Sequence, residues 1–386
     1  MNVKILPSKL SGHIQAIASK SYAHRTLIAA ALSDRPTTFH LNSMSQDIHA
    51  TINALGCLGS HITIEDDKVT VNPINLKENP SVFCKESGTT ARLLLPVMAA
   101  ICDKGTLSGE GSLLNRPFEA LCNAISENGC NFESKHMPIY FSGKMEPGDY
   151  RITGKESSQY VSALMFALPL LNGNSRIVLT SPLQSSGYVD VTLDVLRQFS
   201  IKSGYEIEGK QKFISPSIIN VEGDWSNAAF WIAAGVEDTS LNKDSLQKDK
   251  LFLTLRNQRE IDVADVPDLV PILAVCATLS NKVTFFNNAN RLQFKESNRL
   301  NTTSKMLVNL GADVEVKDDG LIVYGKGKLL GGITDSYNDH RIAMAAAIAS
   351  CFCENEVVIT NADAVNKSYP EFFTHFNSLG GRAHVI

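Results

Sequence analysis

The chain has 386 residues, enough for two or three domains, and 44% of them are hydrophobic, which suffices for sizeable cores. Its 36 basic and 40 acidic residues give a formal net charge of −4, which argues against a nucleic-acid-binding surface or a polybasic membrane patch. The longest apolar runs have about ten residues, too few to span a bilayer. Any site for an anion must therefore be built locally from a few side chains.

Residues 1–10 contain no long apolar segment of the kind found in a signal peptide. The eight cysteines lie mostly within apolar runs and form no CxxC pair. Cys351 and Cys353 form a CxC, but no second pair completes a zinc-binding spacing. We therefore expect reduced core thiols, no metal site and a cytoplasmic protein.

The apolar run at residues 26–32 predicts a helix, and Ser19 or Ser21 stands where its N-terminal cap would lie. A helix N-terminus carries unpaired N–H groups and a partial positive charge, which suits an anion. Lys20 adds a cation there, and Arg25 follows one turn later. This stretch predicts a phosphate or carboxylate site, although a capped helix with solvated charges would explain the stretch alone equally well.

The arrangement recurs along the chain. Apolar helical runs follow at residues 93–101, 164–171, 230–234, 269–278 and 342–349. Most of them lead into a β-rich stretch and a second helix that ends at a glycine, such as Gly59, Gly129 or Gly311, before two short strands. The repeat reads as strand–helix–strand–strand–helix–strand over about 65–70 residues.

Six helix starts imply about six repeats, three in each of two lobes. The fourth repeat is irregular, because residues 238–266 are polar and lack the glycine turn. The third repeat ends near residues 221–224, and no Pro-, Ser- or Gly-rich tether follows it. We expect one lobe at residues 20–222 and a second at residues 1–19 and 223–386, joined by short crossings that allow closure on a ligand.

The residues before these helical runs exceed what helix caps need, because Arg, His and Gln accompany the usual Ser, Thr and Asp. They include Arg92, Gln159, His340 and Arg341, and further cations lie in loops at Arg116, Lys295, Arg299 and Lys367. For any one of these the alternative is a solvated surface charge. As a set at matched positions of a repeat, they predict a site for a multiply anionic ligand.

Asp268 and Glu296 lie beside these cations at helix starts and are the candidates for proton chemistry, with a helix-cap role as the alternative. The sequence contains no GxGxxG and no P-loop motif, so it does not support nucleotide binding. No Ser–His–Asp order or metal-binding cluster stands out.

The motifs of this sequence resemble those of the EPSP synthase family, the 3-phosphoshikimate 1-carboxyvinyltransferases. The resemblance covers nearly the whole chain in order. Its motifs are Ser19-Lys20-Ser21-x-x-x-Arg25, Ser87-Gly88-Thr89-Thr90-x-Arg92, Arg116-Pro117, Ser157-Ser158-Gln159, Lys295-Glu296-Ser297-x-Arg299 and Asp339-His340-Arg341.

The resemblance implies an α/β fold of α+β repeats in two lobes, each with three βαββαβ units around a pseudo-threefold axis, an inside-out α/β barrel. It implies a transferase that moves the enolpyruvyl group of phosphoenolpyruvate to the 5-hydroxyl of shikimate 3-phosphate. Phosphate leaves through a tetrahedral intermediate, without metal or cofactor, in the shikimate pathway to chorismate and the aromatic amino acids. Residues 20–222 would mainly bind shikimate 3-phosphate, and the other lobe would mainly bind phosphoenolpyruvate and supply the acids.

Carried over residue by residue, the resemblance assigns both ligand sets. For shikimate 3-phosphate these are Lys20, Ser21, Arg25, Ser157, Ser158, Gln159, Ser185, Tyr188, Asp268 and Lys295. For phosphoenolpyruvate they are Lys20, Gly88, Arg116, Gln159, Arg299, His340, Arg341 and Lys367. Asp268 would take the 5-hydroxyl proton, and Glu296 with Lys20 would move the proton at the methylene carbon.

Four positions depart from the family's usual pattern. Ala18 stands where Gly is usual, Glu86 where many members have Asn, Ser112 where Arg is common, and Arg291 where some have Asn. They bear on ligand geometry and on sensitivity to the inhibitor glyphosate. Gly88 is retained without a larger side chain, which predicts an open pocket for that inhibitor.

Three other functions are alternatives. A UDP-N-acetylglucosamine enolpyruvyl transferase would be expected to have Asn where Ser21 stands and a reactive Cys in the loop at residues 109–116, which has none. A non-catalytic, anion-binding repeat scaffold would not need Asp268 and Glu296. An RNA-end cyclase shares the repeat but should be more basic. We expect small-molecule substrates, no nucleic acid or membrane partner, and a monomer.

Overall fold

The computed structural model describes residues 1–238 and 240–386, and the chain divides into two compact units. Unit 2 is Ala18–Glu222, and unit 1 combines Met1–Ile17 with Gly223–Ile386. The chain therefore passes between them at two points. In unit 2 the Ser19 N–H donates to the carbonyl of Glu222 at 2.8 Å, and in unit 1 the Asp224 N–H donates to the carbonyl of Ile17 at 2.8 Å. Each crossing segment is thus fastened within its own unit.

Unit 2 alternates helices and short strands. Its α-helices are α1 (Lys20–Ala31), α2 (Gln46–Leu58), α3 (Gly88–Ile101), α4 (Glu119–Ser126), α5 (Ser158–Ala167) and α6 (Ser186–Gln198), with 3₁₀ turns η1 (Gly111–Asn115) and η2 (Leu168–Leu170). Its strands are β3 (Thr37–His40), β4 (Ile62–Glu65), β5 (Lys68–Val71), β6 (Ser81–Phe83), β7 (Lys104–Ser108), β8 (Asn131–Phe132), β9 (Ile139–Ser142), β10 (Asp149–Ile152), β11 (Ser175–Leu179) and β12 (Glu206–Ile207).

The strands of unit 2 form three sheets, with the orders β3-β5-β4, β6-β7-β9-β8 and β10-β11-β12. In the complete repeat, β6 and β7 are parallel and α3 makes the crossover between them, because parallel neighbours cannot be joined by a tight turn. The antiparallel strands β8 and β9 follow α4. The observed order is therefore strand–helix–strand–helix–strand–strand, with both hairpin strands after the second helix, and not the order expected from the sequence.

Unit 1 has the same alternation of helices and strands. Its α-helices are α7 (Trp225–Ala233), α8 (Phe252–Leu255), α9 (Val270–Thr278), α10 (Arg299–Asn309), α11 (His340–Ser350) and α12 (Phe372–Ser378), with 3₁₀ turns η3 (Lys248–Leu251), η4 (Pro267–Leu269), η5 (Asn290–Phe294) and η6 (Ala362–Lys367). Its strands are β1 (Val3–Leu6), β2 (His13–Ile14), β13 (Glu237–Asp238), β14 (Glu260–Asp262), β15 (Val283–Asn287), β16 (Asp313–Lys317), β17 (Gly320–Tyr324), β18 (Gly332–Asp335), β19 (Val357–Thr360) and β20 (Arg382–Val385).

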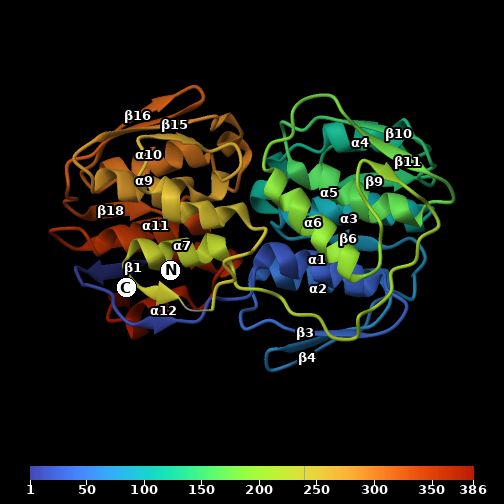
Figure 1. Ribbon diagram of the computed structural model, residues 1–386, viewed down its shortest axis with the longest axis horizontal. Coiled ribbons are helices and arrows are strands. Elements are labelled where there is room, and N and C mark those ends of the chain that lie inside the picture. The colour runs from blue at the N-terminus through green and yellow to red at the C-terminus, as the bar shows by residue number, and fades with distance from the viewer. Residues whose placement is uncertain (239) are drawn as a thin grey trace. The chain divides into compact units, whose positions relative to one another are not determined.

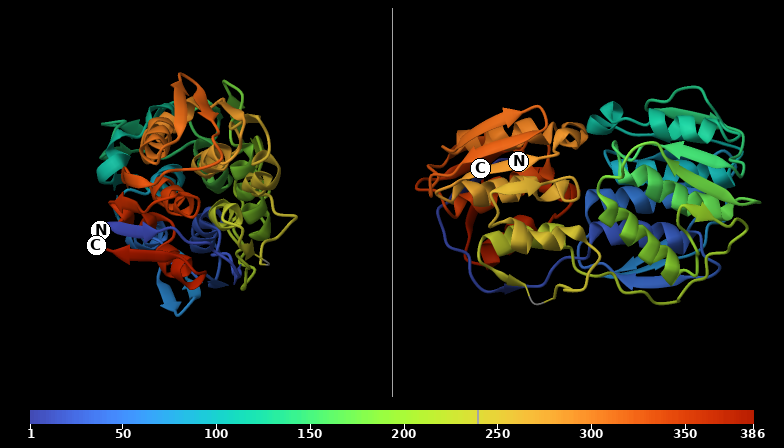
Figure 2. Two further views of the ribbon diagram at one scale, coloured as in Figure 1. Left: turned by 90° about the vertical axis from the view of Figure 1, so that its left-hand side faces the viewer. Right: turned by 45° about the horizontal axis from the view of Figure 1, so that its top comes forward.

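Unit 1 also has three sheets, with the orders β14-β15-β17-β16, β18-β19-β1-β20 and β13-β2. The first strand of the chain, β1, lies between β19 and β20 and is antiparallel to both. Figures 1 and 2 show the two chain ends side by side in this sheet. The N-terminal segment thus completes the last repeat of unit 1, and the expected α/β class with helix–strand repeats in two parts is confirmed.

The irregular stretch at residues 238–266 contains η3, α8 and β14. Thr239 and the side chain of Asp238 lie outside the described residues. The segment carries the buried residues Asp249 and Phe252, and β14 pairs in parallel with β15. The described part of this polar stretch is therefore packed into unit 1.

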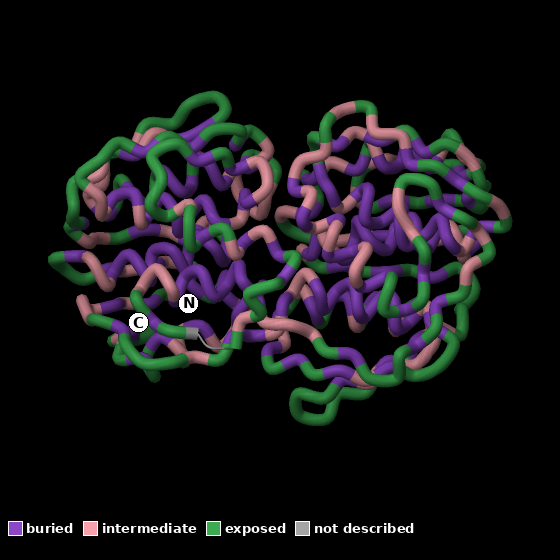
Figure 3. Tube along the Cα trace, in the orientation of Figure 1, coloured by how far each residue is buried: buried purple, intermediate pink, exposed green. Residues whose placement is uncertain are grey.

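Each unit has its own hydrophobic core around nearly fully buried helices, drawn in purple in Figure 3. In unit 2 these are α1, α3 and α5, and in unit 1 they are α7, α9 and α11. Helices that are apolar on all sides require burial on all sides. Since their bodies are buried, their polar first turns are the parts left to meet a ligand.

Among the described residues, no helix combines the length and apolar character needed to cross a membrane. Within the same residues, no group of three or more His, Cys, Asp and Glu side chains is arranged to hold a metal ion. All eight cysteines are free thiols, and Cys57 is exposed although most of the others are buried. Burial raises the pKa of Cys102 and of Cys130 to about 11, so both thiols are protonated at neutral pH.

Candidate active site

Arg25 is the most deeply buried cation of unit 2. Its side chain is 2% exposed, and it donates from Nε to Thr192 Oγ1 at 2.7 Å, from Nη1 to the Ser21 carbonyl at 2.8 Å and from Nη2 to the Tyr188 carbonyl at 3.1 Å. These acceptors are neutral, and burial lowers the pKa of Arg25 to about 10. A buried guanidinium held by neutral oxygens attracts an anion strongly, because little protein charge screens it.

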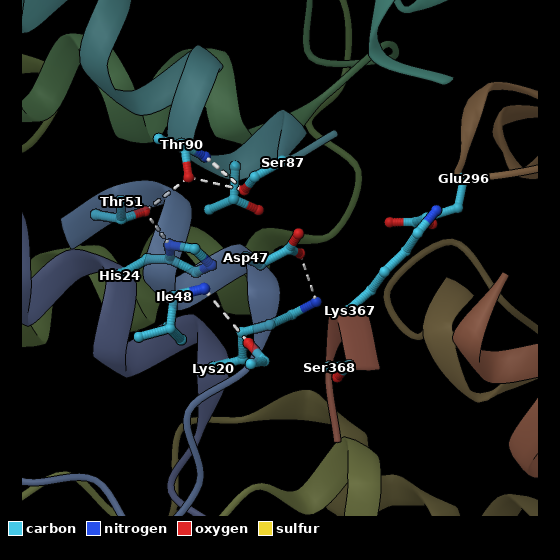
Figure 4. Close-up of polar contacts among 12 residues, drawn as sticks. Lys20, His24, Asp47, Ile48, Thr51, Ser87, Thr90, Glu296, Lys367 and Ser368 are labelled. Atoms are coloured by element: carbon cyan, nitrogen blue, oxygen red, sulfur yellow. Dashed lines mark hydrogen bonds and ion pairs between the residues drawn. The ribbon is translucent and has the colours of Figure 1, made fainter. Parts of the chain in front are cut away.

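Lys20 is the first residue of α1, with Ser19 at the cap position. The Ser19 side chain makes no capping hydrogen bond, so the cap expected from the sequence is present in position only. Lys20 Nζ pairs with Asp47 Oδ2 at 3.0 Å, and both side chains are largely buried (Figure 4). Sequence reasoning missed Asp47; its signal is a carboxylate in the first turn of α2, after the Ser45 cap.

Gln159 is fixed at the start of α5 by two residues of α3. Its Oε1 accepts from Arg92 Nη1 at 3.1 Å, and its Nε2 donates to Thr89 Oγ1 at 2.8 Å. Arg92 also lies over the rings of Phe118 and Tyr160, at 5.7 and 5.6 Å from the ring centres. The amide of Gln159 therefore has one defined orientation, with its oxygen toward Arg92.

Ser157 and Ser158 begin the same helix and are buried, and the Ser157 side chain accepts the Gln159 N–H at 3.3 Å. On α6, Ser185 is fully buried with a left-handed backbone (φ +53°) at the cap position. Tyr188, one turn later, presents its carbonyl to Arg25. The predicted serines thus line helix starts, as the sequence indicates.

Gly88 lies against Arg116 at the start of α3. A Cβ atom added at Gly88 would be 2.4 Å from Arg116 Nη1, so no side chain fits there without moving the guanidinium. The Tyr160 hydroxyl donates to the carbonyl of Pro117 at 2.6 Å and fastens the loop that carries Arg116. The backbone at the start of α3 and the cation of this loop therefore lie directly against each other.

Positions in unit 2 that depart from the family pattern take part in two contacts, in which only Glu86 acts through its side chain. Glu86 Oε2 accepts the backbone N–H of Ser112 at 2.9 Å, so these two residues hold the loop before Arg116 together. The Ala18 N–H donates to Asn42 Oδ1 at 2.7 Å. In unit 1, Arg291 lies on η5; burial is the main cause that lowers the pKa of Lys295, and the charge of Arg291 adds to it.

A buried chain of hydrogen bonds connects α1, α2 and α3 (Figure 4). The Thr90 hydroxyl donates to Ser87 Oγ at 2.7 Å, so Thr51, 2.6 Å from Thr90, donates to it. His24 Nδ1, 2.7 Å from Thr51, must then carry the proton, a tautomer assigned from the network. Burial, with the charges of Lys20 and Arg25, holds the pKa of His24 well below its usual value, so the imidazole is neutral.

In unit 1, three carboxylates from three parts of the chain converge on Arg299. Nε donates to Asp339 Oδ2 at 2.9 Å, Nη1 to Asp268 Oδ1 at 2.7 Å, and Nη2 to Glu296 Oε2. Burial lowers the pKa of Arg299, but the carboxylates of Asp339, Glu296 and Asp268 outweigh this effect and raise it above its ordinary value. The cluster combines both candidate acids with a predicted phosphoenolpyruvate ligand.

Asp268 contacts two further cations, Lys295 Nζ at 3.3 Å and Arg341 Nη2 at 3.2 Å. Burial lowers the pKa of Lys295 to about 8. Neither Asp268 nor Glu296 is a helix cap: Leu269 is at the cap position of α9, and the Asn298 side chain caps α10. The cap alternative for these two acids is therefore wrong.

The first turn of α11 completes the unit 1 set. Asp339 caps this helix by accepting the Arg341 N–H at 3.0 Å, and His340 between them is buried. Lys367, at the end of η6, donates to the carbonyl of Asn338 at 2.9 Å. Asp339 is not among the site residues predicted from the sequence, yet it contacts both predicted arginines.

Asp249 is a further buried acid that the sequence did not point to, because it lies in the irregular segment. It is 4% exposed on η3, and its Oδ1 has no hydrogen-bond partner among the described residues. Burial, and then the charge of Asp268, raises the pKa of Asp249 to about 7, although Arg341 opposes this. Asp249 is therefore a buried carboxyl with a raised pKa beside the cluster.

Taken unit by unit, the structure gathers the predicted residues into two sets. In unit 2 these are Lys20, Ser21, Arg25 and Tyr188 around α1, and Gly88, Arg116, Ser157, Ser158 and Gln159 around α3 and α5. In unit 1 these are Asp268, Lys295, Glu296, Arg299, His340, Arg341 and Lys367.

Comparisons with known proteins agree over the whole chain. The family described as "EPSP synthase (3-phosphoshikimate 1-carboxyvinyltransferase)" matches residues 6–239 and 237–376. A relative named 3-phosphoshikimate 1-carboxyvinyltransferase from Clostridium novyi (strain NT) is 39% identical and covers 98% of both chains. One of the same name from Clostridium acetobutylicum is also 39% identical, covering 99% of this chain and 98% of its own.

A solved structure of EPSP synthase from Acinetobacter baumannii superposes with a TM-score of 0.82 over 99% of both chains, at 22% identity. That likeness shows the fold. The family match and the full-length relatives show more: this chain belongs to the EPSP synthase family.

Proposed function

We propose that this protein transfers the enolpyruvyl group of phosphoenolpyruvate to the 5-hydroxyl of shikimate 3-phosphate and releases phosphate. It is a transferase of the shikimate pathway to the aromatic amino acids. Family membership and the names of relatives that match over their full length support this reaction. The observation that carries it most is the unit 1 cluster, because both candidate acids contact Arg299, a predicted ligand of phosphoenolpyruvate.

The units divide the ligands between them. Unit 2 mainly binds shikimate 3-phosphate: Arg25 and Lys20 supply charge, and the first turns of α1 and α5 supply hydroxyl and N–H donors. Gly88, Arg116 and Gln159 of unit 2 contribute to phosphoenolpyruvate. Unit 1 supplies Arg299, Arg341, His340 and Lys367 to phosphoenolpyruvate, with Asp268 and Lys295 to the acceptor. These assignments rest on the family motifs and on the placement of each residue within its own unit.

The reaction adds and then removes one proton at the methylene carbon. In the addition step, Asp268 takes the 5-hydroxyl proton and the oxygen bonds to the central carbon of phosphoenolpyruvate. Glu296 with Lys20 protonates the methylene group. In elimination, the resulting methyl group returns a proton to the enzyme, the double bond re-forms, and the bond to phosphate breaks. A tetrahedral intermediate links the two steps, and fixed cations stabilise its charge. Removing one such electrostatic group typically slows turnover by about 10²–10³-fold.

The sister reaction, with UDP-N-acetylglucosamine as acceptor, is not favoured by the relatives. We further propose that the protein acts as a monomer in the cytoplasm on small-molecule substrates, without nucleic acid. The near balance of charge supports the last point. Sedimentation equilibrium at micromolar concentration tests the monomer, and a dimer mass would refute it.

Phosphate release tests the function. The purified chain is mixed with phosphoenolpyruvate, with and without shikimate 3-phosphate, and inorganic phosphate is followed over time. We expect release only when shikimate 3-phosphate is present, and a loss of about 10²-fold or more in Asp268→Asn. Release without the acceptor would indicate a phosphatase, and absence of release under both conditions would refute the proposal.

A further inference from the structure

Arg25 of unit 2 and Arg299 of unit 1 are both almost completely buried, with 2% and 1% exposed. Three carboxylates contact Arg299. The described residues around Arg25 offer it only hydroxyl and carbonyl oxygens, and none of them brings a carboxylate to ion-pair distance. Burial lowers the pKa of Arg25 to about 10, which still leaves its guanidinium charged at neutral pH. Unit 2 thus holds a buried positive charge that its contacts do not neutralise.

Thr192 on α6 supplies the hydroxyl that holds the Nε atom of Arg25. Its Oγ1 lies 2.7 Å from Arg25 Nε, and because a guanidinium N–H can only donate, Oγ1 is the acceptor. The Thr192 hydroxyl in turn donates to Ser162 Oγ at 2.8 Å or to the Tyr188 carbonyl at 2.9 Å. Thr192 and Ser162 are both 0% exposed. The hydroxyl of Thr192 is therefore satisfied in both roles, as an acceptor toward Arg25 and as a donor away from it.

The contacts of Arg25 do not use all of its N–H groups. Nη1 donates to the Ser21 carbonyl at 2.8 Å, and Nη2 donates to the Tyr188 carbonyl at 3.1 Å and to Ser162 Oγ at 3.4 Å. Together with the bond from Nε these are four hydrogen bonds to described residues, whereas a guanidinium has five N–H donors. At least one N–H of this guanidinium therefore remains for a ligand.

We propose that Thr192 is a positioning residue for the acceptor substrate: its hydroxyl fixes the guanidinium of Arg25 without neutralising it, so that the charge of Arg25 is kept for an anionic group of shikimate 3-phosphate. The inference deepens the proposed function and rests on it, because it takes Arg25 as a ligand of that substrate. Ser162, on α5, supports the Thr192 hydroxyl from behind.

A hydroxyl suits this position better than the other side-chain groups that would fit. A hydrocarbon side chain would leave the Nε–H of Arg25 buried without an acceptor, which is costly. A carboxylate would hold Nε but oppose its charge, as Asp339 does at Nε of Arg299. The hydroxyl of Thr192 satisfies the N–H and adds no net charge. The proposal therefore predicts different results when Thr192 loses its acceptor and when it gains a charge.

The first test removes the acceptor and then restores it. Thr192→Val keeps the branched shape and removes the hydroxyl, whereas Thr192→Ser keeps the hydroxyl. Isothermal titration calorimetry measures the binding of shikimate 3-phosphate to the whole protein. We expect the Kd to rise by about 10-fold or more in Thr192→Val and by less than about threefold in Thr192→Ser, because only the first loses the hydrogen bond to a charged group. An unchanged Kd in Thr192→Val would overturn the proposal.

Thr37→Val separates positioning from stability. Thr37 on β3 is also 0% exposed, and its Oγ1 lies 2.7 Å from Ser215 Oγ, so this variant loses a buried hydroxyl contact away from Arg25. Denaturant melts should show a loss of stability in both valine variants, but only Thr192→Val should bind shikimate 3-phosphate more weakly. The KM for phosphoenolpyruvate at saturating shikimate 3-phosphate should change by less than about twofold in both. An equal rise of the Kd in Thr37→Val would show that lost stability weakens binding, and would overturn the proposal.

The second test changes charge at constant shape. Thr192→Asn and Thr192→Asp both place an acceptor oxygen near Nε of Arg25, and only the aspartate adds a negative charge. We expect Thr192→Asp to bind shikimate 3-phosphate at least about 10-fold more weakly than Thr192→Asn, because the added carboxylate opposes the anionic ligand. Equal affinities would show that the neutrality of this position has no role. If Thr192→Val does not fold, Thr192→Cys takes its place beside Thr192→Ser, because its sulfur atom is only a weak acceptor.

The outcomes for the inference and for the function are separable, because binding is measured without turnover. Phosphate release by the wild-type protein decides on the function. Turnover in the wild type together with full shikimate 3-phosphate affinity in Thr192→Val would refute the role of Thr192 and leave the reaction intact. Absence of turnover in the wild type would refute the function itself.

Discussion

Gly88→Ala is expected to weaken phosphoenolpyruvate binding through Arg116. The added methyl carbon would lie 2.4 Å from Arg116 Nη1 and 3.4 Å from its Cδ and Cζ atoms. Because optimal contacts between nonbonded heavy atoms are about 3.5–4.0 Å, the guanidinium must move by roughly 1 Å. The clash meets the far end of a flexible side chain, so the protein still folds and the damage falls on the position of the cation.

The size of the effect follows from the displacement. A hydrogen bond to a charged group contributes about 1.5–3 kcal/mol, and a misplacement of about 1 Å can cost on the order of 10²-fold in rate. We therefore expect the KM for phosphoenolpyruvate to rise by about 10- to 100-fold. Binding of shikimate 3-phosphate should change by less than about twofold, because Gly88 and Arg116 are absent from its proposed ligand set.

Steady-state kinetics with each substrate varied in turn measures both quantities. Gly56→Ala is the matched control, since a Cβ atom at Gly56 in the last turn of α2 would meet no atom within 4 Å. That change should leave both KM values unaltered and raise the free energy of unfolding by about 0.5–1 kcal/mol. An unchanged KM for phosphoenolpyruvate in Gly88→Ala would refute the assignment of Arg116 to this substrate.

Four further predictions concern single residues. Arg25→Met should weaken shikimate 3-phosphate binding by about 10²-fold in calorimetry, because it removes a buried cation. The control Arg176→Met, on the exposed surface, should leave the affinity unchanged. Equal affinities of Arg25→Met and the wild-type protein would remove Arg25 from the site. Burial lowers the pKa of Lys295 to about 8, below its ordinary 10.5, so shikimate 3-phosphate binding should weaken as pH rises through about 8, and this step should be missing in Lys295→Met. Between these two pKa values Lys295 is protonated in the unfolded chain and deprotonated in the folded protein, so its contribution to the free energy of unfolding rises with pH. Denaturant melts across this pH range measure the change. A contribution of Lys295 that does not change with pH would contradict the burial argument. Glyphosate should inhibit in competition with phosphoenolpyruvate, since Gly88 carries no side chain; inhibition assays showing no such competition would refute the open pocket.

Local sequence signals predicted the helix starts well. Ser87, Ser157 and Asp339 all cap the helices that the apolar runs indicated, because a cap and its helix are adjacent in the chain. A cap is recognisable from sequence since its partner N–H lies only two or three residues away.

Contacts between distant residues were beyond local reasoning. The pairing of Lys20 with Asp47, the hold of Arg92 on Gln159 and the convergence of three carboxylates on Arg299 all depend on which helices pack together. The insertion of β1 between β19 and β20 joins the two ends of the chain. The periodicity of a short stretch of sequence cannot show which distant strands pair with each other.

The order of elements within the repeat shows the same limit. The apolar periods located the helices and strands, but the parallel crossover from β6 to β7 through α3 decides that both hairpin strands follow α4. Asp249 escaped notice because its segment is polar and irregular in sequence, and only its packing reveals a buried acid.

The most direct test of the central claim is a competition between acceptors. Shikimate 3-phosphate and UDP-N-acetylglucosamine are supplied together at equal concentration with limiting phosphoenolpyruvate, and the products are identified by ³¹P and ¹H NMR. The account predicts that only shikimate 3-phosphate is consumed, that the enolpyruvyl group appears on its 5-oxygen, and that phosphate forms in equal amount. Consumption of UDP-N-acetylglucosamine, or of neither acceptor, would contradict it.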